Sequence, residues 1–269
     1  KYHLYLLQLE NYELGRYFSL LFKKGFLPPK TELRKQLVWT SKAILIFSLA
    51  VFIYLCIAIE LWFWIPASAG MIIKIILLLT TYYLLLYAYF IFYSIVLILL
   101  QPADFLFKQF IVIRTKVKIE NLKSKIKIIG IAGSYGKTTM KEILGQVLGA
   151  RFKVQVTPES VNTPVGIARW ILKTVNELTE IIIVEMGEHY RGDVKDICNM
   201  VKPDIAVATG INEAHLERMK TMENVEATIF EVVSSAKAEA VVVLNGDDKR
   251  VIGSYKKYIL REQKLREYS

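Results

Sequence analysis

The sequence predicts an α/β domain with a mostly parallel sheet over residues 126–269, preceded by a two-helix transmembrane hairpin over residues 43–101. Two long apolar runs predict the hairpin. Short apolar runs that alternate with helical stretches from residue 126 onward predict the α/β domain. With 54% apolar residues, the chain is too apolar for a disordered protein. Its 2 cysteines are too few for a disulfide framework, so we expect reduced thiols.

The basic charge lies in the first part of the chain. The whole chain has 35 Lys and Arg and 25 Asp and Glu, which gives a formal charge of +10. Residues 128–269 hold 19 basic and 19 acidic residues, so the entire excess falls in residues 1–127. A nucleic-acid-binding protein would carry this excess on its folded domain, whereas here it flanks apolar segments. The pattern indicates membrane topology and argues against a nucleic-acid partner.

The hairpin is predicted at residues 43–65, an apolar run with a single charge, and at residues 75–100, a run with none. A helix needs about 20 residues to cross the hydrocarbon core, so both runs are long enough. Basic residues are frequent before and after the pair, whereas the link at residues 66–71 has none. The positive-inside rule therefore predicts a multi-pass protein of the cell membrane, with both termini and the α/β domain in the cytoplasm.

Two further segments flank the hairpin. Residues 1–42 are predicted to be a cytoplasmic N-terminal segment of short helices. Residues 102–125 form a basic linker that mixes apolar and basic side chains. This linker fits either an amphipathic helix on the inner leaflet or a plain basic connection.

The α/β domain is predicted from five short apolar runs, each followed by a helical stretch. The expected strands are Ile126–Ala132, Val154–Thr157, Ile181–Met186, Ile205–Thr209 and Ala240–Asn245. The expected helices cover about residues 137–149, 164–177, 191–201, 222–237 and 249–267. Because strands and helices alternate, we expect a parallel sheet that is covered on both faces.

A glycine-rich turn from Gly130 to Thr139 lies between the first expected strand and its helix, which is the position of a phosphate-binding loop. Its glycines let backbone N–H groups face phosphates, and the helix N-terminus adds a favourable partial charge. Lys137 would bridge the β- and γ-phosphates, and the Thr138 hydroxyl would bind Mg²⁺. The general motif needs glycine where this chain has Ile131, and a glycine-rich turn with an incidental lysine is the alternative.

Polar residues also follow other expected strands, and open α/β sheets bind ligands at the carboxyl ends of their strands. Glu185 ends the third strand and would hold Mg²⁺, with a solvated carboxylate as the alternative. His215 follows the fourth strand, and its position fits a ligand role and a surface role equally. Asn162 and Thr163 precede a helix, where either one could also be a cap.

These residues together resemble the Mur ligase family, the ATP-dependent amide-forming enzymes of cell-wall precursor synthesis, and within it the MurF type. The family loop G-x-x-G-K-T-[ST] is matched by Gly133 to Thr139. The resemblance covers about residues 126–250. Supporting segments occur in the same order at 157–166, 184–187, 191–193, 209–217, 223–224 and 245–248.

The resemblance implies a ligase that uses ATP and Mg²⁺. A substrate carboxylate takes the γ-phosphate to give an acyl phosphate, and an amine then displaces phosphate to form the amide. Lys137, Glu185 and His215 would be catalytic, with Thr138 and Glu185 on one Mg²⁺ and His215 on a second. Asn162 and Thr163 would face the substrate, a cell-wall peptide precursor. The implied nucleotide-binding residues are Gly133, Ser134, Tyr135, Gly136, Lys137, Thr138 and Thr139, with Asn245 and Asp248 near the nucleoside.

Three departures from the family pattern follow. Ile229 stands where the family carries a lysine, often carbamylated, and Lys237 lies two turns further on and is a poor substitute. A membrane hairpin replaces the domain that binds the UDP part of the substrate, so we expect a lipid-linked acceptor or one otherwise at the membrane. The chain stops at Ser269, before the family's C-terminal domain, so we expect a fragment that a missing domain or a partner chain completes.

Two other functions fit parts of the same pattern. A catalytically degenerate, membrane-tethered nucleotide-binding scaffold is favoured by Ile229 and by the missing C-terminal part. A membrane-hairpin kinase with a phosphate loop would also place a nucleotide domain after two spans. The short outer turn and the histidine motif after Glu185 argue against the kinase.

Overall fold

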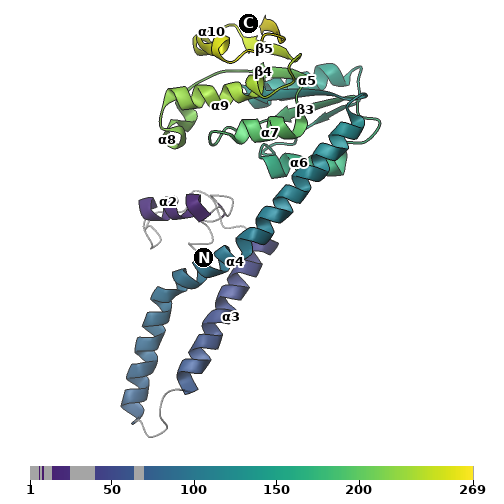
Figure 1. The fold of residues 1–269 in the computed structure, drawn as a ribbon. Coiled ribbons are helices and arrows are strands. Elements are labelled where there is room, and N and C mark those ends of the chain that lie inside the picture. Colours follow the sequence, from purple (N-terminus) through teal and green to yellow (C-terminus); the bar gives the residue numbers. More distant parts are fainter. Residues whose placement is uncertain (1–5, 7, 9–13, 25–39, 64–69, 269) are drawn as a thin grey trace. The chain divides into compact units, whose positions relative to one another are not determined.

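The computed structural model describes residues 6, 8, 14–24, 40–63 and 70–268, and its contacts divide the chain into two compact units, residues 1–106 and 107–269. The first unit contains α2 (Leu14–Lys24), α3 (Ser41–Phe63) and most of α4 (Met71–Leu122) (Figure 1). The second unit contains the end of α4 and the α/β domain. The domain boundaries predicted at residues 42, 101 and 125 stay predictions.

The two apolar runs fall on α3 and α4, but α4 is longer than expected. It continues through Pro102 as far as Leu122, so residues 102–122 are helical and are not a plain linker. Among the residues that the structure describes, no helix has both the length and the apolar character that a membrane crossing requires. The structure therefore does not support the predicted transmembrane hairpin. Part of its predicted turn, residues 66–69, lies outside the described residues.

The α/β unit contains one sheet of six parallel strands in the order β2-β3-β1-β4-β5-β6. The central strand β1 lies between β3 and β4, so the loop that follows it opens in the middle of the sheet's carboxyl edge. The strands are β1 (Lys127–Ala132), β2 (Val154–Val156), β3 (Ile181–Glu185), β4 (Ile205–Ala208), β5 (Val241–Asn245) and β6 (Lys264–Tyr268). The first five confirm the expected strands to within one residue at each end.

Helices cover both faces of the sheet, as expected (Figure 1). On one face Ile129, Ile131 and Ile183 pack against α5, and on the other a larger core joins the sheet to α6, α7 and α9. Because both faces are buried, β1 and β3 are almost purely apolar. The helices are α5 (Lys137–Gly149), α6 (Pro164–Thr174), α7 (Asp193–Val201), α8 (Leu216–Met219), α9 (Met222–Ser234) and α10 (Lys249–Ser254).

The end of α4 is anchored to the α/β unit by side chains that bond to α6. The Lys118 ammonium donates to the carbonyls of Ile171 and Leu172 at 3.2 and 3.0 Å, and the Thr115 hydroxyl donates to the carbonyl of Ala168 at 3.2 Å. These are carbonyls near the C-terminus of α6, where a cation is favoured. Burial lowers the pKa of Lys118. The last turns of α4 are therefore part of the packed domain.

The helix predicted at residues 249–267 is wrong over most of its length. The helix α10 ends at Ser254, and Lys264–Tyr268 forms the edge strand β6, parallel to β5. Leu265 packs into the larger core and Tyr268 into the core on the α5 side, the alternation that a strand requires. This pairing satisfies the backbone hydrogen-bonding groups along the outer edge of β5. The amphipathic charge pattern of residues 249–267 does not reveal the strand.

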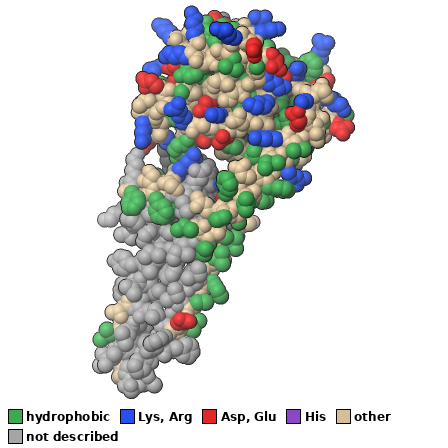
Figure 2. Space-filling model, viewed as in Figure 1, with side chains coloured by type: hydrophobic (Ala, Val, Ile, Leu, Met, Phe, Trp, Pro, Cys, Tyr) green, Lys and Arg blue, Asp and Glu red, His purple; other side chains and the backbone are tan. Residues whose placement is uncertain are grey.

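The surface of the α/β unit carries charges of both signs. On the face shown in Figure 2, Lys and Arg side chains lie among Asp and Glu side chains over this unit. This mixture agrees with the equal numbers of basic and acidic residues after residue 127.

Candidate active site

The loop between β1 and α5 depends on two glycines. Gly133 and Gly136 have φ angles of 149° and 77°, which favour glycine, and α5 begins directly after Gly136. A Cβ atom at Gly133 would lie 2.1 Å from the Thr209 hydroxyl oxygen, so a larger residue would push the loop away from the end of β4. The Ser134 N–H donates to the carbonyl of Gly210 at 2.7 Å. The loop is thus held against the next strand of the sheet.

The Tyr135 side chain connects the middle of this loop to the start of α10 by a hydrogen bond. Its hydroxyl donates to the Asp248 carboxylate at 2.7 Å, and that carboxylate also accepts from the Ile211 N–H at 2.9 Å. The hydrogen bond to Asp248, with burial, raises the pKa of Tyr135 to about 12. Burial alone would raise the pKa of Asp248, but its four hydrogen bonds outweigh burial and lower it.

A cavity of about 260 Å³ opens at the loop and brings together residues from three parts of the chain. The Thr138 hydroxyl lies 3.1 Å from both carboxylate oxygens of Glu185, and the ammonium of Lys141 lies 3.0 Å from Glu185 Oε2. Lys141 is fully buried behind the cavity. The lining residues are Ser134, Tyr135, Gly136, Lys137, Thr138, Thr139, Asn162, Glu185, Glu188 and His189.

Lys137 also has a carboxylate partner in this cavity. Its ammonium lies 2.7 Å from Glu188 Oε1, and it donates to the carbonyl of Gly133. The Lys137 side chain is 13% exposed and that of Glu188 only 1%. The cavity and its wall therefore contain two ammonium groups and two carboxylates, so their charges balance.

Thr138 and Glu185 have the donor chemistry that suits Mg²⁺. A hydroxyl and a carboxylate are hard oxygen ligands, and Mg²⁺ is usually bound by one or two carboxylates together with substrate phosphates and water. Within the described part of the chain, no group of three or more His, Cys, Asp or Glu side chains could hold a metal. A cation here would therefore depend on phosphate oxygens for the rest of its ligands. The prediction for Thr138 and Glu185 fits this geometry.

The other predicted residues are spread around the cavity. Asn162 lines it, and the Asn162 carbonyl accepts from the Gly187 N–H at 2.8 Å. Thr163 caps α6 by accepting from the Gly166 N–H at 3.3 Å. His215 ends a short 3₁₀ helix after β4, and its side chain lies outside the described residues. Its role as a metal ligand stays a prediction.

Asn245 and Asp248 do not line the cavity. The Asn245 amide donates to the carbonyl of Thr209 at 2.7 Å, and Asp248 caps α10 by accepting from the N–H groups of Arg250 and Val251. The Asn245 side chain therefore joins the ends of β4 and β5, and the Asp248 side chain joins the start of α10 to the loop through Tyr135. Contact with a nucleoside stays a prediction for both of them.

The structure also shows where Ile229 and Lys237 lie, the two residues considered for the family's lysine. Ile229 is fully buried in the larger apolar core, as part of α9. Lys237 pairs with Asp204 at 2.8 Å near the start of β4, at the opposite edge of the sheet from the cavity. Lys237 therefore does not replace a lysine at position 229.

Three residues of the site were not predicted from the sequence, namely Glu188, His189 and Lys141. Lys141 lies one helical turn after Lys137, and this i, i+4 spacing places both side chains on one face of α5. Glu188 and His189 follow closely after the end of β3, where ligand-binding residues are expected. These spacings were signals that could have identified the three residues.

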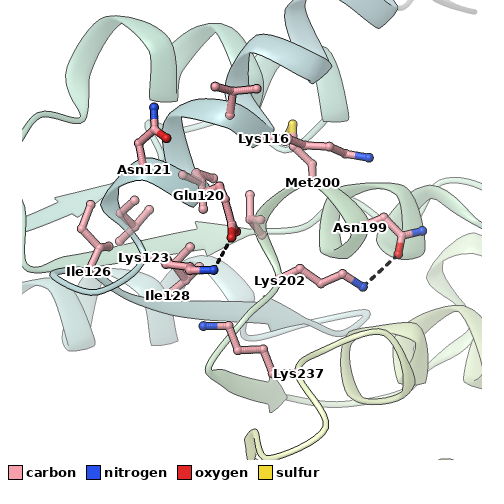
Figure 3. A pocket seen from close by; sticks show the side chains of 14 residues that line it. Lys116, Glu120, Asn121, Lys123, Ile126, Ile128, Asn199, Met200, Lys202 and Lys237 are labelled. Carbon is pink, nitrogen blue, oxygen red and sulfur yellow. Dashed lines mark hydrogen bonds and ion pairs between the residues drawn. The ribbon is translucent and has the colours of Figure 1, made fainter.

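A second, larger cavity of about 410 Å³ lies at the amino edge of the sheet, and several lysines line it (Figure 3). Lys123 directly follows α4, Lys202 directly follows α7, and Lys237 follows the end of α9. Helix C-termini carry partial negative charge, so these lysines neutralise helix ends. Lys123 pairs with Glu120, and the Lys202 ammonium donates to Asn199 at 3.3 Å (Figure 3). This cavity lacks the helix N-terminus and glycine loop that phosphate binding uses.

Known proteins with similar sequences match about half of this chain. The UDP-N-acetylmuramoyl-tripeptide–D-alanyl-D-alanine ligase of Bacillus subtilis is 31% identical over 129 residues, which are 48% of this chain and 28% of that enzyme. The enzyme of the same name from Mycobacterium tuberculosis is 30% identical over 137 residues, 51% of this chain and 27% of that enzyme. The chain thus spans less than a third of the length of either relative.

Solved structures show the same fold. The MurF ligase of Thermotoga maritima, solved in complex with ADP, is similar with a TM-score of 0.55 and 29% identity, over 60% of this chain and 36% of that one. A MurF structure from Acinetobacter baumannii, at 19% identity and a TM-score of 0.56, supports the fold alone. Residues 131–267, about half of the chain, match the Mur ligase middle domain. The chain therefore belongs to the Mur ligase family.

Proposed function

We propose that this chain is the nucleotide-binding part of a MurF-like ligase, which forms an amide bond at the expense of ATP during cell-wall precursor synthesis. The observation that carries the proposal is the cavity in which Lys137 and the Thr138–Glu185 pair meet at a phosphate-type loop. The ADP complex of the Thermotoga maritima relative supports a nucleotide at this loop. The names of the matched relatives support the ligase activity.

The position of each residue around the cavity suggests which part of the substrates it would contact. The loop N–H groups and the Lys137 ammonium would hold the β- and γ-phosphates, where the start of α5 favours negative charge. Thr138 and Glu185 would hold Mg²⁺, which when bound neutralises charge on the phosphates. Asn162 lines the cavity and would face the substrate carboxylate that accepts the γ-phosphate. The resulting acyl phosphate would react with an amine, releasing phosphate and leaving the amide.

A nucleotide titration tests the first half of this proposal. Binding of ADP with Mg²⁺ to the full chain is measured by calorimetry, beside Lys137→Ala and beside the matched control Lys202→Ala at the other edge of the sheet. We expect binding that depends on Lys137 and not on Lys202. Absence of ADP binding by the unsubstituted chain would refute the proposed nucleotide site.

The second half of the proposal concerns the whole enzyme. We infer that a further domain or a partner chain completes the ligase, because the matched relatives are more than three times as long as the region they share with this chain. The acceptor is proposed to be a cell-wall peptide precursor in a lipid-linked form. Ligation assays on the longer protein, with lipid-linked and soluble UDP-linked peptides compared, decide between them. Equal use of the soluble form would refute the lipid-linked acceptor.

A membrane location is proposed on the sequence alone. The apolar runs at residues 43–65 and 75–100, with basic residues around them, support it. Fractionation of cells that express the full chain, followed by a wash at high salt and alkaline pH, tests it. Recovery of the protein in the wash would show that the apolar runs do not anchor it.

A degenerate scaffold is the second candidate function, and Ile229 favours it. A buried isoleucine in the core offers no ligand where the resemblance expects a lysine. Nucleotide binding without ATP turnover in the longer protein would support the scaffold. If Ile229→Lys raises turnover there, the site is an enzyme site with a damaged ligand set.

A further inference from the structure

We propose that the part of α4 that belongs to the α/β unit lies on an anionic lipid surface through an exposed apolar stripe. The stripe consists of Phe107, Phe110, Ile113 and Val117. The inference goes beyond the proposed nucleotide site, because it requires neither a nucleotide nor ligation. It is also separate from the proposed membrane anchor, because a helix can lie on a lipid surface without crossing it.

This part of α4 has two apolar faces, and the α/β unit covers only one of them. Ile111, Ile119 and Leu122 pack into the larger core, on the side where Thr115 bonds to α6. The residues of the apolar stripe follow one another at spacings of three and four, which places them together on another face of the helix. Each of them is between 52% and 56% exposed. In Figure 2, hydrophobic side chains are visible along α4 where it meets the α/β unit. A contiguous row of this kind is typical of an interaction surface, whereas single exposed apolar residues are ordinary.

Two arginines border the apolar stripe and contact its aromatic rings. The Arg114 guanidinium lies over the ring of Phe110, 5.6 Å from its centroid. The guanidinium of Arg169, which belongs to α6, lies over the ring of Phe107 at the same distance. Each arginine therefore places an apolar contact and a positive charge side by side at the edge of the stripe.

The charge around the apolar stripe is positive. Residues 107–119 of α4 contain basic residues and no acidic one, and the same holds for all of α6. Lys116 of α4 and Lys173 of α6 are both exposed. The next acidic residue along α4 is Glu120, and it pairs with Lys123. The apolar stripe and its surroundings thus match a partner that is apolar inside and negatively charged at its surface.

An anionic lipid surface has both properties. The apolar side chains would enter the boundary between headgroups and acyl chains, while the arginine and lysine side chains reach the phosphates of the headgroups. A second copy of this chain is a poorer match. Two copies of the stripe in a symmetric pair would bring their own basic side chains together, and like charges in an interface are unfavourable.

Spin labelling of the full chain in lipid vesicles tests the proposal. Ile113→Cys carries a label in the apolar stripe. Val147→Cys carries the control label, because Val147 is a 66% exposed apolar residue of α5, which covers the other face of the sheet. Both are made together with Cys56→Ser, since Cys56 is exposed and Cys198 is buried. In vesicles that contain phosphatidylglycerol, we expect the label at 113 to collide more often with oxygen than with a water-soluble nickel chelate. The label at 147 should show the reverse.

A charge variant tests the anionic character of the partner. Arg114→Gln should lower the ratio of lipid-exposed to water-exposed label at 113 about fivefold, which is the effect of one basic residue near an anionic surface. Arg151→Gln is the matched control, because Arg151 also lies over an aromatic ring, that of Phe152, at 5.7 Å but beside α5. An equal loss in the Arg151 variant would overturn the inference. Equal lipid contact in vesicles of phosphatidylcholine alone would do the same.

Circular dichroism checks that the labelled variants fold, and Phe110→Cys provides a second label position in the apolar stripe. A water-exposed label at both stripe positions would overturn the inference even if the chain stays with the vesicles, because the apolar runs would then hold it alone. Dipolar broadening between labels on two chains would overturn it in favour of a second copy. If a wash at high salt and alkaline pH strips a chain whose label at 113 had been in lipid, the proposed anchor fails and this inference stands.

Discussion

The two edges of the sheet place lysines in cavities for different reasons. At the carboxyl edge, Lys137 and Lys141 lie at the start of a helix, where cations are disfavoured, and each has a buried carboxylate partner. At the amino edge, Lys123 and Lys202 lie just after helix ends, where cations are favoured without a buried partner. Lysine side chains therefore belong to a candidate binding site at one edge and complement the charge of helix ends at the other.

Cavity volume alone does not decide which edge of the sheet is the better candidate for nucleotide binding. The amino-edge cavity has a volume of about 410 Å³ and the carboxyl-edge cavity about 260 Å³. In a parallel sheet all helix N-termini lie at the carboxyl edge, so the direction of the helices decides where phosphate can bind. The smaller cavity is thus the better candidate for a nucleotide.

The largest effect on stability is expected from Lys141→Met. The change leaves Glu185 without its buried ammonium partner, and loss of one member of such a pair costs about 3 kcal/mol. Lys237→Met at the amino edge removes a half-exposed partner of Asp204, which Lys127 still contacts at 3.4 Å, and should cost less than about 1 kcal/mol. Urea unfolding of both variants measures the difference. Equal losses of unfolding free energy in the two variants would contradict the expectation that the buried Lys141–Glu185 pair contributes more to stability than the Lys237–Asp204 pair.

Lys137→Ala is expected to weaken ADP binding in the presence of Mg²⁺ by at least about 30-fold, because the phosphates lose a charged donor. The amino-edge variant Lys202→Ala should change this affinity by less than about twofold. Its loss removes a positive charge at the end of α7, which should lower stability by about 0.5 kcal/mol and leave nucleotide binding unaffected. Calorimetry gives both affinities. A large loss of affinity in Lys202→Ala would place part of the nucleotide site at the amino edge and contradict the proposed difference between the two edges.

Tyr135→Phe tests how the phosphate loop is supported at the carboxyl edge. It removes the 2.7 Å hydrogen bond from the loop to Asp248, and we expect a loss of about 1 kcal/mol in unfolding free energy and a few-fold weaker binding of ADP. Differential scanning fluorimetry and calorimetry measure the two effects. Unchanged ADP affinity together with lower stability would show that this hydrogen bond supports α10 and leaves the phosphate loop as it is.

The smallest effect is expected in the alkaline unfolding of the chain. The pKa of Tyr135 is raised to about 12, chiefly by its hydrogen bond to Asp248, from an ordinary value of 10.0. A raised pKa means that the folded state holds the proton more tightly, so this contribution is complete below pH 10 and is lost as the pH rises toward 12. Because the residue is 46% exposed, solvent screening reduces the effect. Unfolding free energies of the unsubstituted chain should fall more steeply over this window than those of Tyr135→Phe, and parallel curves would contradict the assignment.

Local patterns in the sequence determined much of the α/β unit. The apolar runs identified β1 to β5, and the helix predicted at residues 137–149 coincides with α5. These predictions succeeded because strand burial and helix starts depend on neighbouring residues and on glycine at particular backbone angles. The resemblance to the Mur ligase family implied that Glu185 and Thr138 share one Mg²⁺, and the 3.1 Å between their side-chain oxygens shows that the two residues lie together, while metal binding stays a prediction.

Contacts between distant segments could not be predicted in the same way. The strand β6 forms because β5 has an open edge, whereas its own residues carry a helical charge pattern. The last turns of α4 are held by hydrogen bonds from Thr115 and Lys118 to carbonyls of α6, more than 50 residues away in the sequence. In both cases the contact depends on a partner that is remote in sequence.

The choice of charge partners was likewise decided by the tertiary structure. From local pattern alone, Lys137 was expected to follow a glycine loop at the start of a helix, with phosphate as the predicted ligand. Only the packing of β3 against β1 shows that Glu188 lies within 2.7 Å of that ammonium and that Lys141 is buried against Glu185. Electrostatic interactions depend on distance and burial in space, and neither can be calculated from spacing along the chain.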